Sequence, residues 1–134
     1  MVWKFKLKED HVFLVPKQFQ KTFFFHELKF YDKKENEWLI LTRNTIETKK
    51  GYSWDGCSPC IKIWGRFFGT PDTKKTYEAS LVHDLLCQFE KHEHMPYSRK
   101  DMDDIFHWIL EREKFWLADV YYAAVRAYSI ILRK

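Results

Sequence analysis

The chain has 134 residues, of which 46% are hydrophobic and 19% aromatic, and its formal net charge is +4 at pH 7. This length and this content of large apolar side chains predict a single folded domain over residues 1–134 and exclude a disordered chain. No apolar run approaches the roughly 20 residues of a membrane span, and the start of the chain lacks the apolar stretch of a secretory signal. With three cysteines and no such signal, we expect reduced thiols.

The positive charge is small and spread out. Lysines are frequent in the first 50 residues, but acidic residues are interleaved with them. A surface that binds nucleic acid usually carries a concentrated basic stripe. The charge therefore favours a solvated surface and makes nucleic acid a possible but less favoured partner.

Residues 1–50 are predicted to be mainly β. Several short segments alternate apolar with polar residues or are rich in β-forming residue types, and Pro16 and the polar turn at 32–36 separate them. The predicted strands lie within 2–8, 12–15, 22–31, 37–41 and 45–48. Their short connections predict an antiparallel meander.

Residues 51–75 contain several glycines and prolines together with large aromatic residues, among them Trp54, Trp64, Phe67 and Phe68. Glycine and proline interrupt regular structure, while the aromatics are expected to pack against the domain. The segment is therefore predicted to be an ordered, aromatic Gly-rich loop.

Residues 76–134 show helical spacing of apolar residues. The first predicted helix covers about 76–90, the second begins at Arg99 with Ser98 as N-cap, and the third covers about 116–132. Strands followed by helices predict an α+β domain: an N-terminal antiparallel meander, the loop, then about three helices packed on the sheet.

His83 and Asp84 are the first candidate site residues, because they are polar positions within an apolar helical segment. Buried polar groups need partners, and Asp55 and Asp103 are the obvious ones. Carboxylates with an imidazole suit a divalent metal or general acid–base catalysis. In the alternative structural interpretation, Asp84 caps a loop backbone and His83 binds a buried carbonyl group.

A zinc site is the second candidate. Cys57 and Cys60 form a C-x-x-C pair, and His83 and Cys87 are one helical turn apart, so the four residues could bind zinc tetrahedrally. Scattered cysteines also occur as small buried apolar residues. A redox C-x-x-C is less favoured, because no thioredoxin-like βαβ pattern surrounds it.

Two further groups have polar side chains of interest. The segment 92–94, His-Glu-His, together with His107 could bind a metal, but its charged surroundings favour a solvated loop. Arg126 lies among small apolar residues and could form an ion pair with Asp84 or Asp103, or bind a phosphate group.

Four short motifs in order resemble domain-of-unknown-function family 1353, a family of small phage and prophage proteins. The first is the Gly-aromatic-x-x-Asp-x-x-Ser pattern at 51–58, and the second is the His-Asp-x-Leu pattern at 83–86. An Arg-x-x-x-Asp-x-x-Phe pattern covers 99–106, and a Tyr-x-Ala-Val-Arg pattern covers 122–126. The resemblance extends over about residues 37–130.

The chain also departs from the family pattern. Pro59 directly follows Ser58, with Cys60 at the usual proline position, and Cys87 stands where the family tends to have an aromatic residue. The cysteine set is therefore not a family trait, which weakens the zinc hypothesis. The resemblance implies a phage-encoded protein that acts in the host cytoplasm or the virion, and it implies no established activity.

Two hypotheses follow. In the first, the protein is a phage accessory protein that binds a host or virion protein, and its Asp/His site is structural. In the second, it is a small metal-assisted hydrolase with a divalent metal ion as cofactor. Its catalytic candidates are Asp55, His83, Asp84 and Asp103, of which the first three are metal-ligand candidates. The candidate binding residues in either case are Trp54, Ser58, Arg99 and Arg126.

Overall fold

The computed structural model describes residues 5–22, 26–54 and 74–132. Its N-terminal part contains a four-stranded antiparallel sheet in the order β2-β5-β4-β3 and a separate pair, β1-β6. The strands are β1 (Phe5–Lys6), β2 (His11–Leu14), β3 (Leu28–Tyr31), β4 (Glu37–Leu41), β5 (Thr45–Thr48) and β6 (Ser53–Trp54). A 3₁₀ turn, η1 (Lys17–Phe19), follows β2.

Residues that alternate along each strand separate the two faces of the larger sheet. The cross-strand row Phe13–Ile46–Leu41 lies on the inner face, and all three side chains are buried. The neighbouring row through Thr48 and Leu39 also faces inward and is buried. On the outer face of β2, Val12 and Leu14 remain exposed. One face of the sheet therefore forms the core, and the other is left to solvent.

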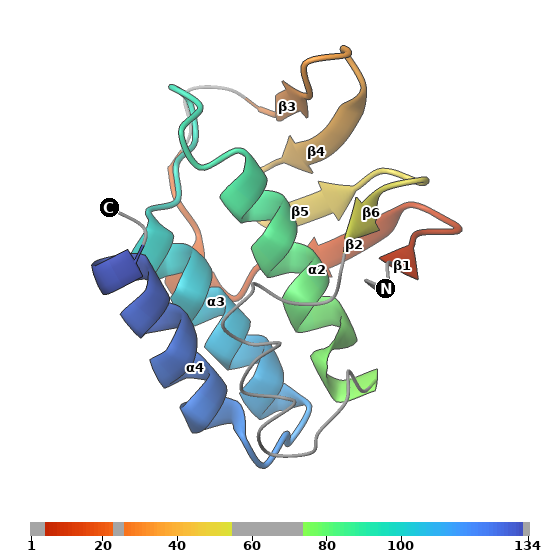
Figure 1. Cartoon of the computed structure of the whole chain (residues 1–134). Coiled ribbons are helices and arrows are strands. Elements are labelled where there is room, and N and C mark those ends of the chain that lie inside the picture. Colours follow the sequence, from red (N-terminus) through yellow and green to blue (C-terminus); the bar gives the residue numbers. More distant parts are fainter. Residues whose placement is uncertain (1–4, 23–25, 55–73, 133–134) are drawn as a thin grey trace.

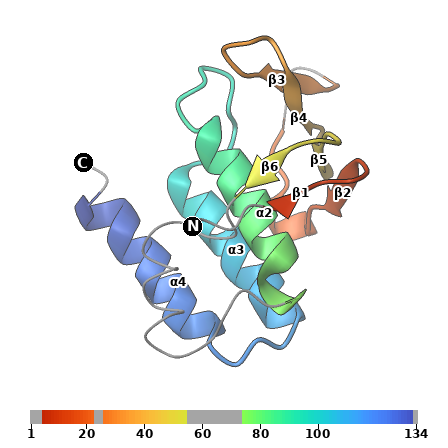
Figure 2. The ribbon, with the colours of Figure 1, turned by 45° about the vertical axis from the view of Figure 1, so that its right-hand side comes forward.

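Three α-helices form the second part of the chain: α2 (Lys74–Gln88), α3 (Arg99–Arg112) and α4 (Ala118–Ala127). A π-helical turn, η2 (Tyr128–Leu132), continues α4. Both views show α2 against the strands, α3 beside α2, and α4 outermost (Figures 1 and 2). Among the described residues, no helix combines the length and apolar character needed to span a membrane.

The start of α3 has a capping box. The Ser98 hydroxyl oxygen accepts a hydrogen bond from the Asp101 backbone N–H at 3.0 Å, and the Asp101 carboxylate accepts one from the Ser98 N–H at 2.9 Å. The two bonds satisfy backbone donors that the first turn leaves free. They fix where α3 begins, and thus which of its residues face α2.

Apolar packing holds the layers together. Leu81, Leu85 and Leu86 of α2 are buried, as are Ile105 and Ile109 of α3. Such fully buried aliphatic side chains stabilise a fold by about 1.5–3 kcal/mol each relative to exposure. The polar groups described below lie inside this apolar packing.

The predicted α+β class and order of elements are confirmed. The prediction of a simple meander is right for β3-β4-β5 but wrong for β2, which pairs with β5 instead of its neighbour in sequence, β3. The third helix begins at Ala118, two residues later than predicted, and its last turn is π-helical. Residues 55–73, most of the predicted Gly-rich loop, lie outside the described residues.

Candidate functional site

A buried carboxylate, Asp103 of α3, is the centre of the largest polar network among the described residues. Its side chain is 0% exposed, and that of its partner His83, on α2, is 2% exposed. His83 Nε2 and Asp103 Oδ1 are 2.7 Å apart, so the imidazole N–H donates to the carboxylate. The aromatic ring of Phe106 packs 5.0 Å from the imidazole.

Three more donors surround the same carboxylate. Asp103 Oδ2 accepts hydrogen bonds from Arg126 Nη1 and from Ser129 Oγ, each at 2.9 Å. Arg99 Nε lies 3.5 Å from Oδ1, which makes this contact electrostatic and not a hydrogen bond. Arg99 also donates to Glu90 Oε1 at 3.3 Å. The network thus joins α2, α3, α4 and η2.

These contacts act on the acidity of Asp103. Burial alone would raise the pKa of the carboxyl group, because a charged group loses its hydration. The hydrogen bond and electrostatic attraction of His83, the hydroxyl of Ser129 and the charge of Arg99 outweigh burial and hold the pKa of Asp103 below its usual value of 3.8. Asp103 is therefore a carboxylate in the folded protein at neutral pH.

The cluster is buried and densely bonded. Asp103 Oδ2 accepts hydrogen bonds from Arg126 and Ser129, and Oδ1 accepts one from His83 and has the Arg99 guanidinium 3.5 Å away. With both His83 and Asp103 almost fully buried, a substrate would have to displace protein atoms to reach them. The geometry is that of a buried polar cluster that links α2, α3, α4 and η2.

Cys87 lies beside His83 on the next turn of α2. Its Sγ atom is 3.7 Å from both Nδ1 and Nε2 of the imidazole. Because the two distances are equal, the sulfur lies off the lone-pair axis of either nitrogen. A thiol must lie on that axis to transfer its proton to the imidazole. Burial raises the pKa of the thiol to about 12. In this arrangement Cys87 is a protonated thiol and not an activated nucleophile.

Four of the predicted site residues lie outside the described residues: Asp55, Cys57, Ser58 and Cys60. The separation of 3.7 Å between Cys87 Sγ and His83 Nδ1 is near the ~3.6 Å expected between sulfur and nitrogen ligands of tetrahedral zinc. The zinc set therefore stays a prediction.

Asp84 and Trp54 are not among the Asp103 contacts described above. Asp84 is half-buried on α2, turned by about 100° from His83. Trp54 of β6 is buried, donates from Nε1 to Ser80 Oγ at 3.1 Å and stacks on Tyr52. The indole therefore joins β6 to α2.

The predicted meeting of His83 with Asp103 and the predicted ion pair between Arg126 and Asp103 are both present. Sequence reasoning missed Ser129, although its spacing of three residues from Arg126 places both on one helix face. It also missed the contact of Arg99 with Asp103, whose spacing of four residues is a helical ion-pair signal.

The family model described as "Protein of unknown function (DUF1353)" matches residues 32–125. The chain belongs to this family. No curated protein and no solved structure shows significant similarity to it.

The DUF1353 match begins at the hairpin turn before β4 and ends within α4. It includes His83 and Asp103 but stops one residue before Arg126. The carboxylate and imidazole are thus inside the matched region. Arg126 and Ser129, which donate to Oδ2, follow it.

A second cluster lies on the surface between α3 and α4. Ligand atoms of His107, Glu111 and Asp119 lie within 4.8 Å of one another, the set of this kind found among the described residues. His107 Nε2 is 2.8 Å from Asp119 Oδ1, and its Nδ1 is 3.2 Å from Glu111 Oε1. His107 thus meets Glu111 and Asp119 instead of the 92–94 segment.

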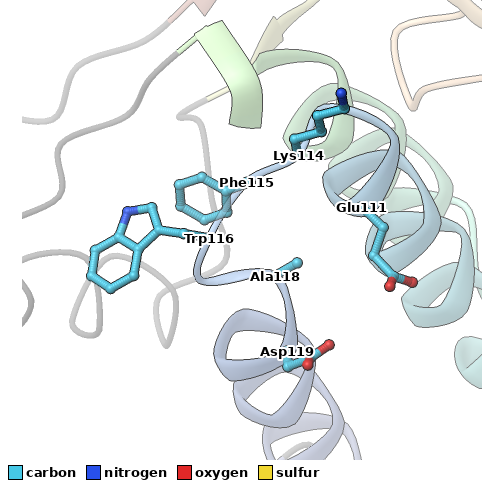
Figure 3. Close-up of a pocket in the computed structure, with 6 residues that line it drawn as sticks. All are labelled: Glu111, Lys114, Phe115, Trp116, Ala118 and Asp119. Atoms are coloured by element: carbon cyan, nitrogen blue, oxygen red, sulfur yellow. The ribbon is translucent and has the colours of Figure 1, made fainter.

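Glu111 and Asp119 line a hollow of about 300 Å³. In Figure 3, Trp116 points away from both carboxylates. Both nitrogens of His107 already face a carboxylate. The Asp119 side chain is 90% exposed, and surface ion pairs of this kind contribute about 0–1 kcal/mol. The cluster is explained as a solvated ion-pair group.

Proposed function

We propose that this DUF1353 protein is a phage-encoded accessory protein that binds a host or virion protein, in the host cytoplasm or the virion, and that its Asp103 cluster is structural. The observation that supports the structural role is the burial of the Asp103 carboxylate among protein groups: it accepts hydrogen bonds from His83, Arg126 and Ser129 and lies beside Arg99. A catalytic carboxylate needs a face open to substrate, water or metal.

Exposed apolar side chains support the binding role. Val12 and Leu14 lie on the outer face of the edge strand β2, and Ile130 and Ile131 are exposed on η2. Single exposed apolar residues are ordinary, but pairs of them on one element are the kind of surface that partners cover. We place the protein partner on the outer face of β2.

The structural role is tested by measuring metal content and thermal stability together. We expect Asp103→Asn to lower the melting temperature of metal-free protein. We expect Zn²⁺, Mn²⁺ and Mg²⁺ to leave the melting temperatures of wild type and Asp103→Asn unchanged. The matched control is Asp119→Asn, which removes an exposed carboxylate. A metal-dependent rise in melting temperature that Asp103→Asn abolishes and Asp119→Asn retains would favour the metal-assisted hydrolase.

The binding role is tested separately by crosslinking and affinity capture with identification of the captured protein. We expect Val12→Ser/Leu14→Ser to lose the captured protein while keeping the wild-type circular dichroism spectrum. The control Lys8→Ser/Lys17→Ser changes two exposed polar positions and should retain it. Equal capture by both variants would show that the captured protein does not bind the outer face of β2.

A further inference from the structure

A concavity of about 680 Å³ lies where the β3–β4 turn meets the C-terminal end of α2. Figure 1 shows these two segments at the same end of the molecule, although about 55 residues of sequence separate them. The residues that line it are Tyr31, Asp32, Lys33, Lys34, Asn36, Gln88, Phe89, Lys91 and His92. We refer to it as the lysine hollow.

The lysine hollow gathers positive charge that is scattered in the sequence. Lys33, Lys34 and Lys91 are all exposed, and none has a carboxylate oxygen within 4.0 Å among the ion pairs of the described residues. By contrast, Lys29 and Lys49 nearby on the sheet are each held by two carboxylates. The three lysines therefore keep their charge available for a ligand.

Among the described residues, Asp32 is the carboxylate that lines the hollow, and it is already bonded. Its oxygens accept from the backbone N–H of Lys34 and Asn36, from the Asn36 side chain and from Trp38 Nε1. These bonds, the Asn36 backbone first and then the Trp38 indole, lower the pKa of Asp32 to about 2. Asp32 thus builds the turn that presents Lys33 and Lys34, and its oxygens are directed to the turn.

Aromatic rings accompany the charges. The Tyr31 side chain is 51% exposed at the hollow. His92 is exposed too, and its ring is fixed edge-on against Phe30 with centroids 4.7 Å apart. Phe30 packs in turn on Phe89, which lines the hollow from α2. The rings form a firm apolar wall beside the lysine side chains.

Lysine and exposed aromatic rings together indicate phosphate esters of nucleic acid. Lysine binds phosphate as a compact point charge, and three lysines line this hollow. Single strands bind by stacking bases on aromatic rings while cationic side chains follow the backbone.

We propose that the lysine hollow binds single-stranded nucleic acid, with phosphates on Lys33, Lys34 and Lys91 and a base stacked on Tyr31. The hollow has room for one or two nucleotides, and a longer strand continues over the surface on either side. This inference concerns a surface away from the outer face of β2, so it does not depend on the proposed protein partner.

The test is fluorescence anisotropy of a labelled ten-nucleotide uridine strand in 50 and 200 mM salt. The triple variant Lys33→Gln/Lys34→Gln/Lys91→Gln should bind at least roughly tenfold more weakly in low salt, and its slope of log affinity against log salt should shrink by about 2. The matched control Lys8→Gln/Lys17→Gln/Lys75→Gln removes the same charge from exposed positions outside the hollow. It should stay within about twofold of wild type.

Stacking is tested by Tyr31→Thr, which keeps a β-forming residue in β3. It should weaken binding roughly tenfold with an unchanged salt slope, whereas Trp116→Ser, which removes an exposed ring elsewhere, should not. Competition by free uridine monophosphate at similar affinity would identify a free nucleotide as the source of the same chemistry. The proposal is overturned if wild type does not bind the strand, if both lysine triples lose equally, or if polyglutamate competes and Tyr31→Thr has no effect.

Discussion

Replacing Asp103 by asparagine tests the network with the smallest change of shape. The amide can still accept from His83, but its NH₂ group must face Arg126 and Ser129, which now donate to Oδ2. The lost charge also weakens the His83 bond. Hydrogen bonds to charged groups contribute about 1.5–3 kcal/mol each, and the share of Arg126, whose side chain is 21% exposed, is reduced by solvent screening. We expect a loss of about 3 kcal/mol in the free energy of unfolding, in line with the ~3–5 kcal/mol for breaking a buried pair.

The measurement is urea unfolding followed by far-ultraviolet circular dichroism, with the slope against urea checked for two-state behaviour. Asp119→Asn, on an exposed carboxylate, should cost less than about 1 kcal/mol. The double variant Asp103→Asn/Arg126→Met should cost less than the sum of its single variants, because removing both partners leaves less uncompensated charge. A loss below about 1 kcal/mol for Asp103→Asn, or strict additivity in the double variant, would refute the reasoning.

Three more outcomes are expected. Because the folded-state pKa of Asp103 is lowered, its stabilisation is complete above about pH 5 and is lost as the pH falls through that lowered pKa. The stability difference between wild type and Asp103→Asn should therefore shrink as the pH is lowered below about 5, and a constant difference would contradict this. Ser98→Ala should lower the free energy of unfolding by about 1 kcal/mol by removing the capping box of α3, and unchanged urea unfolding would count against this. Because burial raises the pKa of Cys87 to about 12, iodoacetamide at pH 8 should label it far more slowly in folded than in urea-unfolded protein, as read by peptide mapping; equal rates would show an open thiol.

The parts of the fold that local chemistry decides were predictable. β4 and β5 occupy the predicted residues 37–41 and 45–48, because β-forming residues there are bounded by polar turns. The start of α3 follows from Ser98 and Asp101, whose side chains act only on their own turn. The position of β2 next to β5 was not predictable in this way, because both edges of the β3-β4-β5 meander offer the same backbone groups, and long-range packing selects one.

The candidate site divides along the same line. That His83 needs a buried partner follows from its place in an apolar helix, and Asp103 was one of two residues predicted for it. The role of Ser129 was not predictable, because a serine near a helix end usually bonds only the backbone of its own helix. Ser129 Oγ does lie 2.8 Å from Val125 O, but it also contacts Asp103 Oδ2. Sequence spacing could not show that three hydrogen-bond donors and the Arg99 guanidinium would surround one carboxylate. That result depends on the mutual rotation of three helices.

The same rotation suggests why an apolar domain keeps a charged cluster in its core. Buried ion pairs add little net stability compared with apolar residues of similar size. Apolar packing alone is tolerant of sliding and rotation, and α4 is the outermost helix, packed mainly on α3. A carboxylate that must receive Arg126 and Ser129 from α4 and η2, and His83 from α2, accepts only one rotation of each helix. On this argument Asp103 contributes specificity of helix placement more than stability, and its removal should loosen α4 and η2 before it affects the sheet.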